Sequence, residues 1–142
     1  MIHSIYIPLH GIPKRDLSQS EMDEALKQPD SLLWVSLEQS DIEDARKILQ
    51  ETFHFHPLSI EDCQSTGYQP SKVDDFNSYI FMIFHALSSN PNFSELKTIV
   101  LDFFLGPNYL VTSHQAAQMP PVEAIWKRIE KDERVYSNGS DF

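Results

Sequence analysis

The longest apolar run in the sequence, Tyr79 to Phe84, most constrains what this chain can fold into. It belongs to a longer segment, Tyr79 to Leu87, in which both sets of alternate side chains are largely apolar. Successive side chains of a strand point to opposite faces, so such a strand has to be covered on both sides. The segment therefore predicts the central strand of a sheet with helices on both faces, a layered α/β (α+β) fold.

Further strand candidates are rich in β-branched and aromatic residues and are separated by turn residues. They are Ser4 to Leu9, Ser31 to Glu38, Lys72 to Phe76, Leu96 to Leu105 and Tyr109 to His114. The turn at Gly106-Pro107-Asn108 predicts that the last two strands form an antiparallel hairpin. We expect a mixed, largely antiparallel sheet.

Two helices are predicted in the first half of the chain. Met22, Ala25 and Leu26 lie at helical spacing, with Ser20 as the expected N-cap. A second helix is expected to start at Ser40, because Glu43 three residues later completes a capping-box pattern. Its apolar stripe consists of Ile42, Ala45, Ile48, Leu49 and Phe53.

Two more helices are predicted further along. Pro57 is expected to open a short helix that runs to about Ser65 and is broken by Gly67. The polar stretch from Ser88 to Ser94 is expected to be a loop. Pro121 is expected to open the last helix, with an apolar stripe of Val122, Ile125, Trp126 and Ile129.

Composition limits the classes of function. The 142 residues fit one domain, and 21 acidic against 11 basic residues give a formal charge of −10. Such a surface argues against nucleic acid as a partner, because phosphate binding requires a basic surface. No signal peptide and no apolar segment of membrane-spanning length is found, and Cys63 has no cysteine to pair with. We expect residues 1–142 to be a single soluble domain.

Residues that could bind a metal gather around the start of the third helix. His54 and His56 precede Glu61 and Asp62, which suggests a small metal-dependent hydrolase as one alternative. The extended dipeptide His56-Pro57 explains the histidines without a metal, and no zinc-binding motif of the HExxH type is present. Glu61 and Asp62 lie away from the first turn, where the helix dipole would favour them. They are therefore either simply solvated or face a cation or a basic partner.

From Trp34 onward, the sequence resembles the N-terminal cytoplasmic domain of the CorA family of magnesium and cobalt transporters. The resemblance covers the chain from about residue 31 to its end. Its segments are WVSLEQSDIEDARKILQETF, His56-Pro57-Leu58, Ile60-Glu61-Asp62, Gln69, Lys72-Val73-Asp74, Phe76, Tyr79-Ile80-Phe81, Phe103-Phe104-Leu105-Gly106, Asn108 to Thr112, Val122 to Ile129 and Gly139-Ser140-Asp141. One departure is Gln69-Pro70-Ser71-Lys72, where the family usually has Gln-Arg-Pro-Lys.

The resemblance implies a non-enzymatic fragment of a larger membrane transporter, whose stalk helix, two membrane spans and Gly-Met-Asn motif are not in this sequence. It implies a homopentamer at the cytoplasmic face of the cell (inner) membrane. Divalent ions, Mg²⁺ and as further candidates Co²⁺ or Ni²⁺, would bind between its subunits and hold the pore closed. The acidic pair of that site aligns with Glu61 and Asp62, and the partner carboxylates come from the stalk. The alternatives are a zinc-exporting relative of the same family and a non-catalytic interaction module.

Overall fold

The computed structural model describes residues 1–65, 69–88, 97–116 and 119–131. The expected helix break at Gly67, most of the expected loop from Ser88 to Ser94 and the matched segment Gly139-Ser140-Asp141 lie outside these residues. The strands are β1 (Ile2–Ile7), β2 (Lys14–Arg15), β3 (Leu32–Glu38), β4 (Lys72–Asp75), β5 (Ile80–Ser88), β6 (Lys97–Leu105) and β7 (Tyr109–His114). The helices are α1 (Gln19–Leu26), α2 (Ile42–Lys47), the π-helical η1 (Ile48–Thr52), α3 (Pro57–Gln64) and α4 (Pro120–Lys131).

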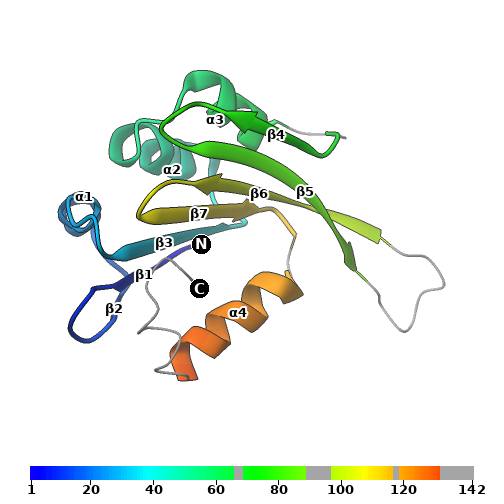
Figure 1. Ribbon diagram of the computed structural model, residues 1–142. Helices are drawn as coiled ribbons and strands as arrows, with labels where there is room; N and C mark the ends of the chain where they lie inside the picture. Colours follow the sequence, from blue (N-terminus) through cyan, green and yellow to red (C-terminus); the bar gives the residue numbers. More distant parts are fainter. Residues whose placement is uncertain (66–68, 89–96, 117–118, 132–142) are drawn as a thin grey trace.

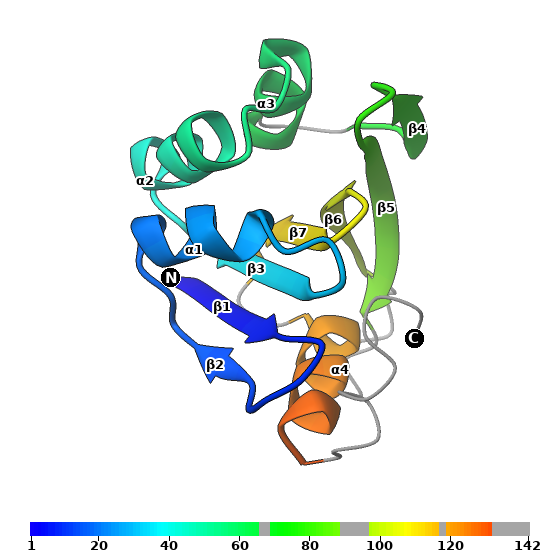
Figure 2. The same cartoon turned by 60° about the vertical axis from the view of Figure 1, so that its left-hand side comes forward.

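Within the described residues, the seven strands form one sheet in the order β2-β1-β3-β7-β6-β5-β4. Among the strands of the described residues, β3 and β7 form the only parallel pair, and every other neighbouring pair is antiparallel. Helices α1 to α3 lie on one face of the sheet and α4 lies on the other (Figures 1 and 2). The predicted layered fold with a mixed, largely antiparallel sheet is confirmed.

The described residues form two apolar cores, one on each face of the sheet. The larger one lies under α1 to α3 and includes Leu33, Val35, Phe81 and Phe104. The smaller one lies under α4 and is built around Trp34, whose ring packs edge-on against Trp126 at a centroid distance of 4.8 Å. The two faces of β3 thus divide between the cores, as a strand that is apolar on both faces requires.

The prediction that Tyr79 to Leu87 is the central strand is wrong. Strand β5 is next to the edge strand β4, and β7 occupies the middle of the sheet. Tyr79, Phe81 and Ile83 are buried, but Ile80 is 36% exposed and Phe84 is 44% exposed. An antiparallel sheet can leave part of one face to solvent, and α4 packs on the other end of this face.

Both predicted N-caps are one or two residues out. Ser18 rather than Ser20 caps α1, in a capping box with Glu21. Asp41 rather than Ser40 caps α2 by accepting a hydrogen bond from the Glu43 amide, and Ser40 instead donates to the Met1 carbonyl. In each case a second capping residue lies within one turn of the predicted one. Ser18 is selected by its local capping box with Glu21, whereas the Ser40 hydroxyl is engaged by the long-range bond to Met1.

The predicted apolar stripes are only partly buried. Ala45 and Leu49 are in the core, but Ile42 at the start of α2 is exposed. In α4, Val122 and Ile129 are buried and Ile125 is exposed. The helix starts at Pro120, one residue before the predicted Pro121. A single helix on a sheet buries a narrower stripe than its sequence pattern suggests.

Candidate metal-binding site

Helix α3, which carries Glu61 and Asp62, is fixed at its start by a cap and a tyrosine. Pro57 occupies the first turn, and the His56 Nδ1 atom accepts a hydrogen bond of 3.1 Å from the Leu58 amide. The Tyr79 hydroxyl accepts a bond of 2.8 Å from the His56 amide and lies 2.7 Å from the Ser59 hydroxyl. Because Tyr79 is buried next to β5, these bonds hold α3 over the sheet.

The two predicted site residues differ in their surroundings. Glu61 is exposed, and no ion pair of this side chain is found within the described part of the chain. Asp62 is half-buried, and its Oδ2 atom lies 2.5 Å from the Lys72 ammonium. Lys72 also pairs with Asp74 at 2.9 Å. The structure therefore places Asp62 in a carboxylate–ammonium–carboxylate arrangement between α3 and the edge strand β4.

The charge of Lys72 is stabilised by both neighbours. Hydrogen bonds from its ammonium to Asp62 and Asp74 raise its pKa above the ordinary value for lysine. The ammonium also lies 5.8 Å from the centre of the buried Phe81 ring. Lys72 ends the segment Gln69-Pro70-Ser71-Lys72, which lacks the expected arginine but keeps the expected lysine. The structure places this lysine at the candidate site.

A second, buried acid lies beneath this pair. Asp102 on β6 is 6% exposed, and its Oδ1 atom has no hydrogen-bond partner within the described residues. The pKa of Asp102 is raised to about 7, and burial is the largest cause. A hydrogen bond with Cys63 and the charge of Lys72 act to lower the pKa, and the charge of Asp62 acts to raise it. Burial likewise raises the pKa of the Cys63 thiol, so this cysteine is not a reactive thiolate.

Sequence reasoning missed Asp102 because it lies within a strand that is otherwise apolar. A single acid between Leu101 and Phe103 was the available signal. Charged groups are rarely buried without a partner, so such a residue indicates either a protonated carboxyl or a nearby cation.

The histidines do not join Glu61 and Asp62 in one metal site. Within the described residues, no three His, Cys, Asp or Glu side chains lie close enough together to hold a metal ion. His56 caps α3 through its ring, and His54 adopts a left-handed backbone conformation with φ of 55°. The hydrolase hypothesis gains no support from this geometry. A cation at Glu61 and Asp62 would need further ligands from another chain or another part of the protein.

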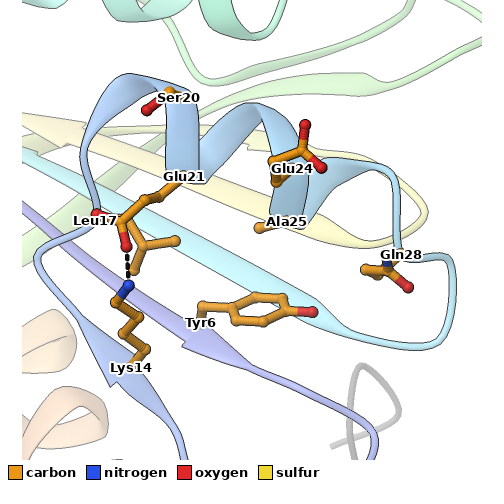
Figure 3. A pocket seen from close by; sticks show the side chains of 8 residues that line it. All are labelled: Tyr6, Lys14, Leu17, Ser20, Glu21, Glu24, Ala25 and Gln28. Carbon is orange, nitrogen blue, oxygen red and sulfur yellow. Dashed lines mark ion pairs between the residues drawn. The ribbon is translucent and has the colours of Figure 1, made fainter.

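The structure also contains an open groove far from these carboxylates. Its volume is about 490 Å³, and it lies between α1 and the β1–β2 hairpin (Figure 3). The ring of Tyr6 forms its floor, and an ion pair between Lys14 and Glu21 crosses one end. A groove that is this open and is bridged by its own ion pair provides no enclosed polar site.

Comparison with known proteins places this fold in a family. Residues 29–142 match the family described as CorA-like Mg²⁺ transporter protein. YfjQ of Bacillus subtilis (strain 168), whose name describes a metal ion transporter, is 32% identical over 117 residues, which cover 82% of this chain. The chain belongs to the CorA-like Mg²⁺ transporter family. It spans 34% of the length of YfjQ.

Solved structures show the same fold. The soluble domain of CorA from Methanocaldococcus jannaschii gives a TM-score of 0.65 at 14% identity, covering 93% of this chain and 47% of that one. The cytoplasmic domain of ZntB from Vibrio parahaemolyticus RIMD 2210633 gives 0.63 at 12% identity, covering 89% and 49%. Full-length CmaX gives 0.67 at 12% identity, covering 90% and 38%. The predicted resemblance is confirmed. In the described residues, no helix has the length and apolar character that crossing a bilayer requires.

Proposed function

We propose that this chain is the N-terminal cytoplasmic, ion-sensing domain of a divalent-cation transporter that carries Mg²⁺. Family membership supports transport of a metal ion, and the YfjQ relative is about three times as long as the region it shares with this chain. The remainder of such a protein would supply the stalk and the membrane spans. The proposed assembly is a homopentamer at the cytoplasmic face of the cell membrane.

The observation that carries the sensing role is the position of the acidic pair. Glu61 is exposed, and Asp62 is half-buried on a helix whose start is fixed by Tyr79. Mg²⁺ prefers oxygen ligands and keeps several of its waters, so two carboxylates can contribute to a site that another subunit completes. We propose that Mg²⁺ bound between Glu61 and Asp62 of one subunit and carboxylates of the next stabilises the closed assembly. Loss of Mg²⁺ would then shift the population toward an open one.

The replacement Asp62→Asn tests this proposal. In the full-length protein, we expect the Mg²⁺ concentration that gives half-maximal protection against proteinase K, which has little side-chain preference, to rise at least about tenfold, because a charged ligand is lost. The matched control is Asp44→Asn, which makes the same change on the exposed surface of the neighbouring helix α2 and should leave the midpoint unchanged. Equal midpoints for the two variants would remove Asp62 from the site.

The same titration separates the ions. Protection at millimolar Mg²⁺ supports the proposal, and protection by Co²⁺ or Ni²⁺ would extend it to those ions. Protection by Zn²⁺ alone would instead favour the zinc-exporting alternative. Assembly and protection that are independent of every divalent ion would favour a pure interaction module.

A further inference from the structure

Lys72 lies where a bound cation would interact with Asp62. Its ammonium is 2.5 Å from the Asp62 carboxylate and 2.9 Å from the Asp74 carboxylate. An ammonium held between two carboxylates satisfies the same electrostatic need as a metal ion in that place. Asp62 is therefore already neutralised by its own chain.

The position of this lysine is built into the sheet. Lys72 pairs with Ile83 and Asp74 pairs with Phe81 in the β4–β5 register, and both partners are buried. The two charged side chains therefore extend from the same face of β4, the face that α3 covers. The side chain of Lys72 is 33% exposed, whereas the ion-paired Lys14 and Lys27 are 60% and 67% exposed. Lys72 is held more firmly than an ordinary surface lysine.

We propose that Lys72 sets the cation affinity of the Asp62 site, because its ammonium is a tethered cation that a divalent ion must displace from Asp62 toward Asp74. This inference rests on the proposed function, in which Asp62 binds the ion. Binding is then an exchange of one cation for another. Asp74 receives the displaced ammonium, so the lysine keeps a partner throughout.

This exchange accounts for the kind of ion that the site would accept. A free monovalent ion gains little by displacing a tethered ammonium of equal charge and high effective concentration. A divalent ion brings twice the charge to the carboxylates of two subunits and can displace it. The competition also weakens binding, which suits a sensor that responds to an abundant ion and releases it when the concentration falls.

The replacement Lys72→Met tests the inference in the full-length protein, with Mg²⁺ as the probe. We expect the half-protecting Mg²⁺ concentration to fall roughly five- to tenfold, because the competing charge is gone and a half-exposed ion pair no longer has to be broken. Lys72→Arg keeps the charge and should stay closer to the wild type. Lys47→Met removes an exposed lysine from the nearby α2 and should change the midpoint by less than about twofold.

A second variant, at Asp74, is expected to shift the half-protecting Mg²⁺ concentration in the opposite direction. Asp74→Asn leaves the Lys72 ammonium with Asp62 as its only charged partner among the described neighbours, so the half-protecting concentration should rise. In the Lys72→Met background, Asp74→Asn should have no effect, because Asp74 acts only by receiving the ammonium. A double-mutant cycle over the four proteins measures this coupling. If Asp74→Asn raises the half-protecting concentration as much in the Lys72→Met background as in the wild type, Asp74 is itself a ligand of the ion and the exchange is overturned.

The outcomes separate this inference from the proposed function. If Asp62→Asn weakens Mg²⁺ protection but Lys72→Met leaves it unchanged, Asp62 senses the ion and Lys72 is only a structural link between α3 and β4. If Lys72→Met remains folded by circular dichroism and requires more Mg²⁺, Lys72 positions Asp62 and does not compete. If Asp62→Asn has no effect, the proposed function fails and the inference fails with it.

Discussion

Replacing Phe104 with alanine is expected to lower the free energy of unfolding by about 3–5 kcal/mol. Phe104 on β6 is fully buried, and its ring stacks on Phe55 at a centroid distance of 4.3 Å. It also contacts Phe81 at 4.8 Å, and Tyr79 lies 6.2 Å away. Alanine would remove the central ring of this cluster and leave a cavity that neighbouring strands are too constrained to fill.

The same change should loosen the helix that carries the acidic pair. Tyr79 packs against Phe55 at 4.5 Å, and its hydroxyl bonds to the His56 amide and the Ser59 hydroxyl. Loss of the Phe104 ring removes support from both aromatic neighbours. We therefore expect amide hydrogens of α3 to exchange faster in Phe104→Ala than in the wild type.

Phe84→Ala is the matched control for this stability measurement. Phe84 lies on the neighbouring strand β5, on the other face of the sheet, and is 44% exposed. Urea unfolding at pH 7 should show a loss of about 1 kcal/mol or less for this variant. If Phe84→Ala costs as much as Phe104→Ala, the aromatic cluster does not dominate the core under α3.

The elements of the fold follow from local patterns, but their order in the sheet does not. Alternating apolar residues identify the segment from Tyr79 as a strand, and the turn at Gly106 identifies a hairpin. The pattern of Tyr79 to Leu87 cannot show that Ile80 and Phe84 are left partly exposed, because coverage depends on where α4 packs. The apolar stripe of α4 likewise cannot show that Ile125 is left exposed, because this too depends on where the helix packs.

The candidate site was predictable only in part. The sequence places Glu61 and Asp62 on a short helix opened by Pro57, and the structure confirms that helix. The sequence cannot show that Lys72, ten residues after Asp62, pairs with it, because a loop and a strand register bring the two residues together. The burial of Asp102 likewise depends on the contact between α3 and β6, which no local pattern encodes.

Asp102→Asn is expected to stabilise the protein at high pH. The pKa of Asp102 is about 7 in the folded protein against an ordinary value of 3.8, because burial disfavours the carboxylate. Below pH 3.8 the group is neutral in the folded and unfolded states and costs nothing. As the pH rises toward 7, the unfolded state releases its proton and the folded state does not, so stability is progressively lost.

Above pH 7 this loss is complete, and the pKa difference corresponds to at most ~4 kcal/mol. Asparagine cannot ionise, so the stability of the variant does not fall in this pH range, although the two N–H donors of its buried amide need acceptors. We expect Asp102→Asn to be more stable than the wild type by about 1–3 kcal/mol at pH 8. The measurement is urea unfolding of both proteins at intervals between about pH 4 and pH 9.

The difference between the two curves isolates Asp102, because other titrating groups contribute equally to both proteins unless they touch this carboxyl. It should grow from pH 4 to pH 7 and then level off. A difference that is constant across this range would show that the folded Asp102 ionises normally. The charge of Asp62 raises the pKa of Asp102 and that of Lys72 lowers it. The pH at which the difference levels off should therefore be lower in an Asp62→Asn background and higher in a Lys72→Met background. Both shifts would show that the charges of Asp62 and Lys72 act on the buried Asp102.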